Sequence, residues 1–504
     1  MTSAPRYGPQ LITYADRLSG SIPAVTTLLT DELRDAFDGV HLLPYFTPFD
    51  GTDAGFDPVD HTQVDPRLGN WSDVLALAQQ RVVMSDVIVN HVSTRSPMFK
   101  DYLERGDGSS WAPMFLTLSS VFPDGATEAE LASIYRPRPG LPFTAMTVGQ
   151  ERRLVWTTFT PDQVDLDLRS EMAWEYLEGV IEALTSAGVT MLRLDAVGYT
   201  GKQRGTSCFM TSATEAYTNR IMTFAHALGA TVLLEVHGHY LEQVEIARTV
   251  DYVYDFALPP LVLHALHAQD LEPLMNWLQV RPLNCVTVLD THDGIGIVDV
   301  GESDRRPGVP GLLTPTQIDA LVEDIHRASG GTSRAATGAA ASNLDLYQVN
   351  CTFYEALGSD DARYLLARIM QLMVPGIPQV YYVGLLAGSN DLELLRASGV
   401  GRDVNRHRYS PEEVSDALAR PVVKAQLDAL RLRREHEAFE GEFASSALGS
   451  DLVMTWTNGP HKVELRADVA SSTFALLASG REGQVVRDDT TARGAALGTD
   501  SPNS

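Results

Sequence analysis

The chain has 504 residues, 44% of them hydrophobic, and its 39 basic against 65 acidic side chains give a formal net charge of −26. This composition indicates a globular protein with a large core and more than one domain, and so acidic a surface argues against nucleic acid or an anionic membrane as a partner. The three cysteines, Cys208, Cys285 and Cys351, are too few and too scattered for a disulfide framework or a metal site. The N-terminus has no apolar signal core and no apolar run is long enough to cross a membrane, so we expect a cytoplasmic protein.

Short apolar runs alternate with amphipathic stretches along most of the chain, a pattern that favours strands separated by helices. Eight runs are predicted strands, at residues 11–15, 40–44, 82–89, 189–195, 231–235, 250–256, 285–289 and 378–383. Helices are predicted at residues 71–80, 171–187, 214–228, 364–373 and 421–438. Eight strands that alternate with helices are typical of a (β/α)₈ TIM barrel, an α/β fold whose functional residues lie at the C-terminal ends of the strands.

The alternation is interrupted twice, which predicts two inserted loop-rich subdomains. The first insert holds the proline-rich stretch 136–142, which can be neither regular helix nor central strand. The second holds an alanine-rich run at 335–341, predicted to be a helix or a close-packed turn. The alternating tail predicts a small β domain with a disordered terminus. The predicted division is 1–88, 170–294 and 359–438 for the barrel, 89–169 for the inserted B domain, 295–358 for the second insert and 439–504 for the C-terminal β domain.

Three of the predicted strands are followed by carboxylates: Asp195, Glu235 and Asp293. Arg193 lies two residues before Asp195, on the same face of its strand, and we expect this partner to keep Asp195 ionised, as a carboxylate nucleophile requires. Taken alone, the pair could equally be structural. Glu235 follows an apolar run and is the better candidate for a proton-donating acid. Three carboxylates around one pocket suit glycosyl transfer through an oxocarbenium-like transition state.

Two histidines, His91 and His292, also lie just after apolar runs. A single histidine at a strand end is more often a core residue than a ligand-binding one. Here both occur beside carboxylate-bearing strand ends, which favours a role in donating hydrogen bonds to sugar hydroxyls.

These residues carry a family resemblance. Residues 86–91, 192–196, Glu235 and 291–293 resemble, in the same order, the four motifs of the α-amylase family of retaining α-glycosidases. Within that family the chain resembles the sucrose phosphorylases, at residues 12–17, 43–51, 134–142, 254–260, 340–348 and 401–406. The resemblance covers nearly the whole chain and fades after about residue 440.

The resemblance implies reversible, retaining phosphorolysis of sucrose to α-D-glucose 1-phosphate and fructose through a covalent β-glucosyl-Asp intermediate, with transglucosylation and hydrolysis as side reactions. It implies Asp195 as nucleophile, Glu235 as acid/base and Asp293 as transition-state stabiliser. It also implies no organic cofactor, no metal and a homodimer. The substrate contacts that it implies are Asp53, Phe56, His91, Arg138, Phe159, Arg193, His237, His292, Asp345, Tyr347, Gln348 and Arg402.

The acceptor step separates phosphorolysis from hydrolysis. Phosphate is already anionic, so it needs positive charge beside the glucosyl-enzyme more than it needs a base, and a planar guanidinium can bind two of its oxygens. Arg138 and His237 are the candidates, with a hydroxyl from Tyr347. Without the resemblance, Arg138 would be interpreted as a solvated loop arginine. Asp345 and Gln348 are expected to shape the fructose or phosphate side.

Alternative functions remain open from the sequence. The nearest are phosphorylases that act on sucrose 6'-phosphate, glucosylglycerol or glucosylglycerate. A charged acceptor should demand extra cationic side chains, for which Arg136 and Arg334 are available. Next are a retaining α-glucoside hydrolase and a transglucosidase. A non-catalytic member of the fold is disfavoured because all three carboxylates are present. The effect of Gly238 and His239, which follow the acid/base motif, is not predicted.

Overall fold

The centre of the molecule is a closed barrel of parallel strands. The computed structural model describes residues 8–137, 140–303, 305–306, 308–337 and 348–480, and the backbone of 486–490. The barrel strands follow one another in the spatial order β1-β16-β13-β12-β11-β10-β5-β2. They are β1 (Gln10–Thr13), β2 (Gly39–Leu42), β5 (Val82–Ile88), β10 (Met191–Asp195), β11 (Thr231–Leu234), β12 (Tyr252–Asp255), β13 (Cys285–Thr287) and β16 (Ile377–Tyr381). Every predicted strand is therefore found in the barrel, and the predicted (β/α)₈ fold class is confirmed.

The barrel strands are buried on both faces, which is why they appear in the sequence as continuous apolar runs. Their register brings the polar residues of separate motifs together. Arg193 on β10 is paired with Asp86 on β5 on one side and with Leu233 on β11 on the other. The residues that follow β10 and β11, including Asp195 and Glu235, consequently emerge at the same end of the barrel.

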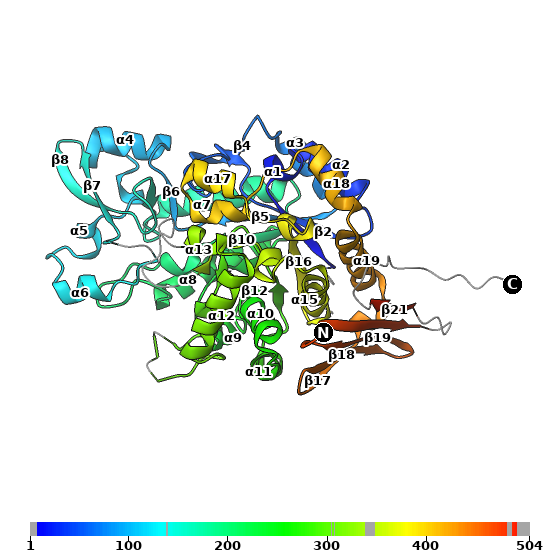
Figure 1. Ribbon diagram of the computed structural model, residues 1–504. Helices are drawn as coiled ribbons and strands as arrows, with labels where there is room; N and C mark the ends of the chain where they lie inside the picture. The colour runs from blue at the N-terminus through cyan, green and yellow to red at the C-terminus, as the bar shows by residue number, and fades with distance from the viewer. Residues whose placement is uncertain are drawn as a thin grey trace.

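Helices surround the barrel, as the alternation predicts (Figure 1). They include α2 (Ile22–Thr30), α3 (Trp71–Ala78), α7 (Glu171–Ser186), α8 (Ser212–Ala227), α9 (Tyr240–Ile246), α10 (Leu258–Ala268), α11 (Glu272–Val280), α15 (Asp361–Met373) and α19 (Pro421–Glu435). Two helices begin earlier than predicted because capping residues start them. Thr211 accepts from the backbone of Thr214 at the start of α8, and Asp360 accepts from Ala362 and Arg363 at the start of α15.

Between β5 and β10 the chain forms the segment seen in cyan on one side of the barrel in Figure 1. Its strand β6 pairs antiparallel with β9, and β7 and β8 form a hairpin. This pairing attaches the segment directly to the end of β5. The elements are β6 (His91–Ser93), α4 (Pro97–Arg105), α5 (Leu118–Val121), α6 (Glu128–Ser133), β7 (Phe143–Val148), β8 (Glu151–Trp156) and β9 (Gln163–Asp165).

Between β13 and β16 lies a second segment that contains a short antiparallel pair and several helices. Its elements are β14 (Ile295–Gly296), η4 (Val298–Val300), α12 (Pro315–Ala328), α13 (Thr332–Thr337), β15 (Gln348–Val349) and α14 (Phe353–Ala356). The first residues of the predicted alanine-rich run 335–341 belong to α13, and the rest lie outside the described residues. After β16 the chain continues through α16 (Tyr382–Leu385), α17 (Leu392–Ser398), η5 (Gly401–Asn405) and α18 (Pro411–Ala419).

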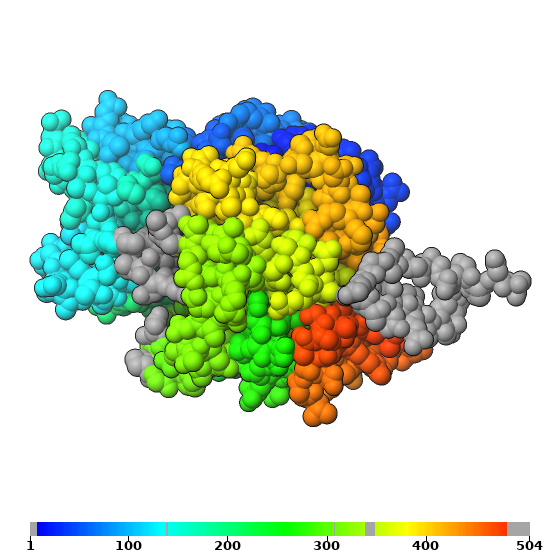
Figure 2. All heavy atoms as spheres, viewed as in Figure 1, coloured from blue at the N-terminus to red at the C-terminus, as the bar shows by residue number. Residues whose placement is uncertain are grey.

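The tail forms the predicted antiparallel β structure. Its strands pair in sequence order: β17 (Glu442–Leu448), β18 (Asp451–Asn458), β19 (His461–Asp468), β20 (Thr473–Ser479) and β21 (Val486–Thr490). The sheet, orange to red, packs against the barrel helices on the side away from the cyan segment (Figure 2), and Trp456 donates to the carbonyl of Met373 on α15 at 2.7 Å. The predicted disordered terminus lies outside the described residues. None of the helices in the described part of the chain combines the length and the apolar character needed to span a bilayer.

Candidate active site

A single pocket opens at the C-terminal ends of the barrel strands. Of the predicted site residues that the structure describes, all except Arg193 line it. Arg193 lies beneath the pocket, with a side chain that is 2% exposed. Arg138, Asp345 and Tyr347 lie outside the described residues. The lining residues are Asp53, Phe56, His91, Pro137, Phe159, Gln163, Asp195, Ala196, Gly198, Tyr199, Phe209, Glu235, Val236, His237, His292, Asp293, Gln348 and Arg402.

Below the pocket, Arg193 is shared between two carboxylates. Its Nη1 donates to Asp86 Oδ1 at 2.5 Å and to Asp195 Oδ1 at 2.8 Å. Asp86 is completely buried and also contacts His41 at 3.0 Å. Burial alone would raise the pKa of Asp86, but the neighbouring His41 and Arg193 lower it to about 2. Arg193 therefore neutralises a permanent buried charge on Asp86 and has only part of its own charge left for Asp195.

The expected ion pair between Arg193 and Asp195 is present, but it does not by itself keep Asp195 ionised. Burial raises the pKa of Asp195 well above its ordinary value, Arg193 lowers it, and the Glu235 carboxylate raises it again. Glu235 Oε1 lies 4.0 Å from Arg193, so both carboxyl groups depend on the same cation. The ionisation of Asp195 therefore depends on the charges of its neighbours as well as on its own burial.

Glu235 is held in place by the backbone of the neighbouring strand. The N–H of Ala196, the residue after Asp195, donates to Glu235 Oε2 at 3.1 Å. Ala196 adopts a left-handed conformation with φ of 55°, which is unfavourable for a residue with a Cβ. The turn directs this N–H across to Glu235 instead of along the strand. The strained backbone is thus found where a hydrogen bond between two carboxyl-bearing strand ends requires it.

Asp293 is kept ionised by arginine. Arg402 on η5 forms an ion pair with Asp293, with 2.7 Å between Nη1 and Oδ1, and it donates to Gln348 Oε1 at 3.4 Å. Burial alone would raise the pKa of Asp293, but Arg402, His292 and Arg406 together lower it well below the ordinary range. Asp293 is therefore a fixed negative charge at the pocket wall, suited to stabilising positive charge that develops on a ligand.

The two predicted histidines at the strand ends are neutral. Burial lowers the pKa of His292 to about 3, and burial also lowers the pKa of His91. His292 stacks on Phe56 with ring centroids 4.7 Å apart. His91 Nε2 lies 2.9 Å from the backbone carbonyl of Phe56, to which it donates. Both rings are thus fixed against Phe56, and a neutral imidazole can still exchange hydrogen bonds with hydroxyl groups.

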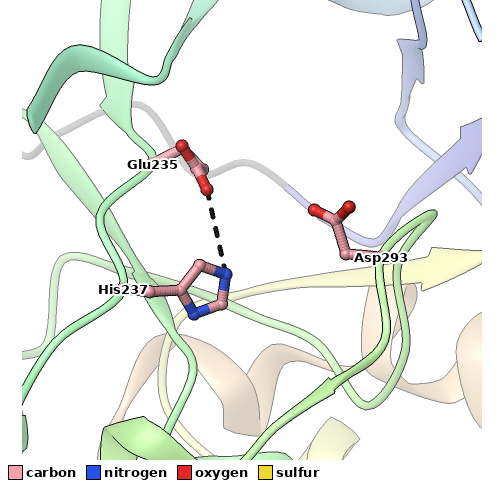
Figure 3. A group of neighbouring side chains, drawn as sticks. All are labelled: Glu235, His237 and Asp293. Atoms are coloured by element: carbon pink, nitrogen blue, oxygen red, sulfur yellow. Dashed lines mark ion pairs between the residues drawn. The ribbon is translucent and has the colours of Figure 1, made fainter. Parts of the chain in front are cut away.

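His237, in contrast, is favoured as a cation. Its Nδ1 lies 2.9 Å from Asp299 Oδ2, and its Nε2 lies 3.8 Å from Glu235 Oε1. Burial would lower the pKa of His237, but Asp299 outweighs it, with Glu235 and Asp293 adding to the effect, and the pKa is raised. Figure 3 shows His237 beside Glu235, with Asp293 across the pocket from both.

Glu235, His237 and Asp293 present one nitrogen and two oxygens within 4.8 Å of one another, a spacing that a metal ion could use. A ligating histidine must offer an unprotonated nitrogen, whereas the surroundings of His237 favour its protonated form. Asp293 is already paired with Arg402. The charges of this cluster are therefore balanced by protein groups, which fits an acid–base site better than a metal centre.

The aromatic wall to which the predicted Phe159 belongs also contains two residues that were not predicted, Tyr199 and Phe209. Tyr199 lies between Phe159, at 5.0 Å, and Phe209, at 4.8 Å between ring centroids. A Cβ at position 198 would lie 2.5 Å from the Phe209 ring, so Gly198 is needed for this packing. Tyr199 follows the motif at 192–196 closely enough to be suspected from sequence. Phe209 and Gln163 have no local signal, since folding of distant loops brings them to the pocket.

His239 does not line the pocket. Its Nε2 donates to the carbonyl of Pro310 at 3.0 Å, and its Nδ1 accepts from the backbone of Leu241 at the start of α9. The additional imidazole after the acid/base motif therefore connects that loop to the second segment.

One buried lysine links the β6–β9 segment to the barrel. Lys202 Nζ lies 2.6 Å from Asp165 Oδ2 and 3.0 Å from Asn90 Oδ1, and it also donates to the carbonyl of Tyr199. Its side chain is 2% exposed. A buried ammonium group with three oxygen partners holds together the strand ends that carry His91 and Tyr199. This role of Lys202 was not predicted from the sequence.

Comparison with known proteins agrees with the fold and the motifs. The model of the alpha-amylase catalytic domain matches residues 33–240. A sucrose phosphorylase from Bifidobacterium adolescentis is 54% identical over 436 residues, which cover 86% of this chain and 86% of that protein. A sucrose phosphorylase from Agrobacterium vitis is 53% identical over 477 residues, which cover 94% of this chain and 97% of that protein.

A solved structure extends the likeness to the whole molecule. The crystal structure of sucrose 6F-phosphate phosphorylase from Thermoanaerobacter thermosaccharolyticum superposes with a TM-score of 0.88 and 34% sequence identity. The superposition covers 97% of this chain and 99% of that one, so the segments outside the barrel are included.

Proposed function

Because the chain belongs to the α-amylase family, in the group of the sucrose phosphorylases and related glucoside phosphorylases, we propose that it is a sucrose phosphorylase. The reaction is the reversible phosphorolysis of sucrose to α-D-glucose 1-phosphate and fructose, with retention of configuration. It proceeds through a covalent β-glucosyl intermediate on Asp195, and transglucosylation and hydrolysis are side reactions. The substrates and products are sucrose, inorganic phosphate, glucose 1-phosphate and fructose.

In the first step, Asp195 attacks the anomeric carbon while Glu235 protonates the departing fructose oxygen. The hydrogen bond that Arg193 donates to Asp195 at 2.8 Å supports this division, because it stabilises the ionised carboxylate that a nucleophile needs. Asp293 stabilises the positive charge that develops on the ring. His91, His292 and the pair formed by Asp53 and Arg402 hold the glucose.

In the second step, an oxygen of hydrogen phosphate attacks the anomeric carbon and the bond to Asp195 breaks, which returns the electron pair to the carboxylate. The proton of the phosphate passes to Glu235 and restores its acid form. Two inversions give net retention. Until that proton transfer, Glu235 is ionised and faces an anion, and this repulsion must be offset. His237 lies 3.8 Å from Glu235 and supplies positive charge at that point. Arg138 and Tyr347 are proposed as further phosphate contacts, and Asp345 and Gln348 as residues that shape the acceptor side.

The observation that carries the proposal is the position of His237, whose pKa is raised by Asp299, at 3.8 Å from the acid carboxyl of Glu235. A hydrolase needs a base at that position to activate water, whereas an anionic acceptor needs positive charge. The high identity to sucrose phosphorylases supports sucrose over the substrates of the sister enzymes.

The proposal also includes the domain organisation, the location and the assembly of the protein. The domain division at 1–88, 170–294 and 359–438, with segments 89–169, 295–358 and 439–504, is supported by the element order. A cytoplasmic location and the absence of nucleic-acid and membrane partners are supported by the acidic composition. A homodimer is supported by the family resemblance.

The test is the release of glucose 1-phosphate, fructose and free glucose from sucrose, measured with and without inorganic phosphate. Phosphate-dependent glucose 1-phosphate, equal in amount to the fructose released, is expected. Free glucose at the same rate with and without phosphate would make the protein a hydrolase. Parallel assays with sucrose 6'-phosphate, glucosylglycerol and glucosylglycerate decide among the sister activities, since the preferred donor has the highest kcat/KM.

A further inference from the structure

Asp299 lies beneath the pocket, in the short helix η4, and is 0% exposed. Its carboxylate accepts three hydrogen bonds. His237 Nδ1 donates to Oδ2 at 2.9 Å, and the backbone N–H of Gly238 and the amide of Gln243 donate to Oδ1 at 3.1 and 2.9 Å. All three partners are donors, which is the environment of an ionised carboxylate.

The His237 ring has little freedom to turn. It stacks on Phe256 with ring centroids 3.9 Å apart and an interplanar angle of 12°. On the other side, a Cβ at position 296 would lie 2.7 Å from Asp299 Oδ2 and 3.5 Å from the ring, so Gly296 leaves the space that the pair needs. With Nδ1 directed to Asp299, Nε2 is directed to the side of Glu235.

Three carboxylates face His237: Asp299 from η4, Glu235 from the loop after β11, and Asp293 from the loop after β13. In the proposed reaction Glu235 is the acid/base, which loses and regains a proton in each cycle. Asp293 stabilises the positive charge that develops on the glucose ring. Asp299 does not line the pocket, so it is shielded from substrate. Of the three, it is the one that is hydrogen-bonded to His237 and lies outside the pocket lining.

We propose that Asp299 is a positioning residue for the phosphate step, because it orients His237 and keeps it doubly protonated so that Nε2–H can be donated to the anionic acceptor. The inference rests on the proposed function. It states that a buried residue contributes to the preference of the glucosyl-enzyme for phosphate over water as the acceptor. Without the charge of Asp299, the protonated imidazole loses its hydrogen-bonded counter-ion, and its Nε2–H becomes a weaker donor to an anionic acceptor.

The test is the Asp299→Asn variant. Asparagine keeps the size of the side chain and an oxygen for Gly238, but it removes the charge. We expect the KM for phosphate to rise roughly tenfold or more, because the variant weakens one charge-assisted hydrogen bond to phosphate. The rate of sucrose hydrolysis without phosphate should change by less than about threefold, because that reaction does not use the cation. The fraction of glucose released as free sugar should therefore increase.

The matched control is Gln243→Met, which removes a neighbouring hydrogen bond to the same carboxylate and leaves its charge. A purely structural role for Asp299 predicts that both variants lose phosphate affinity together. The proposed role predicts that only Asp299→Asn loses phosphate affinity. It also predicts a change in pH dependence: phosphate affinity falls as the pH rises and His237 loses its proton, and this fall should occur at lower pH in Asp299→Asn alone. The comparison is made after correction for the ionisation of phosphate itself.

A direct measurement separates this inference from the proposed function. Nitrogen-15 labelling of the 13 histidines, with His237 assigned through a His237→Gln variant, reports its protonation without any substrate. His237 should be cationic near neutral pH in the native enzyme and neutral in Asp299→Asn. The same titration in both proteins would overturn the inference even if sucrose phosphorolysis is confirmed. Failure to form glucose 1-phosphate would overturn the proposed function and leave the histidine titration to decide on Asp299.

Discussion

Ala196 and Glu235 are joined by a hydrogen bond from the backbone N–H of Ala196 to Glu235 Oε2, over 3.1 Å. The residue that follows the proposed nucleophile thus holds the proposed acid. Because the bond connects the ends of β10 and β11, the two carboxyl groups cannot move independently. A change at either strand end is therefore expected to shift the position of the other carboxyl group.

Glu235→Gln tests the proposed acid. The amide cannot give a proton to fructose, so kcat for sucrose should fall by about 10²- to 10⁴-fold. α-D-Glucosyl fluoride, whose leaving group needs no protonation, should still glucosylate Asp195, and phosphate should still accept the sugar. Fluoride release and glucose 1-phosphate formation measure the two steps. Asp195→Asn is the control that should abolish both, and an equal loss on both donors in Glu235→Gln would contradict an acid role.

Arg402→Leu tests the fixed charge on Asp293. Arg402 forms an ion pair with Asp293 at 2.7 Å and contributes to its lowered pKa, so its removal should raise that pKa. A carboxylate with a raised pKa is protonated sooner as the pH falls. The acid limb of the kcat/KM profile for sucrose should therefore move to higher pH. KM for sucrose should also rise, by about tenfold or more.

Arg402→Lys retains the positive charge and is the matched control for this substitution. In this variant the acid limb of the kcat/KM profile should lie closer to that of the native enzyme than in Arg402→Leu. Lysine lacks the guanidinium group whose second nitrogen donates to Gln348. Unchanged pH profiles in both variants would mean that Arg402 does not set the ionisation of Asp293.

Lys202→Met tests the attachment of the β6–β9 segment. The change leaves Asp165 buried without its cation, which costs about 3–5 kcal/mol of the free energy of unfolding. A second change, Asp165→Asn, removes the unpaired charge. The double variant should therefore be more stable than Lys202→Met alone, a non-additive result. Urea midpoints measure the effect, and additive losses would show that the two side chains are not coupled.

Acid stability should depend on His61, which is completely buried away from the pocket and contacts the hydroxyl of Tyr176. Burial lowers its pKa from 6.5 to about 3. The unfolded chain therefore binds more protons than the folded one between these values, and stability falls as the pH drops below about 6.5. At pH 5 the contribution of this one histidine is a loss of about 2 kcal/mol.

His61→Gln removes the titrating group and keeps a polar side chain beside Tyr176. The decrease in the urea midpoint from neutral pH to about pH 5 should be smaller in this variant than in the native protein. An identical decrease would assign the acid sensitivity to other groups, His292 among them, because its pKa is also lowered to about 3.

Site residues could be predicted from the sequence where reactive side chains directly follow an apolar strand. Asp195, Glu235, His292 and Asp293 all come directly after buried runs, and parallel strands of a barrel deliver such residues to one end. The ionisation of Asp195 could not be predicted in this way. Its neighbour Arg193 is visible in the sequence, but the division of that arginine between Asp86, Asp195 and Glu235 depends on the register of adjacent strands.

The sequence by itself determined the barrel strands, the order of the motifs and the three carboxylates, because strands buried on both faces leave continuous apolar runs that end in polar residues. Only the tertiary structure decided which distant side chains meet. Asp299 reaches His237, Lys202 reaches Asp165, and Phe209 packs on Gly198 through loops that carry no periodic pattern. Those contacts are set by the packing of loops on the barrel, and they decide the charge and position of groups that the sequence could only name.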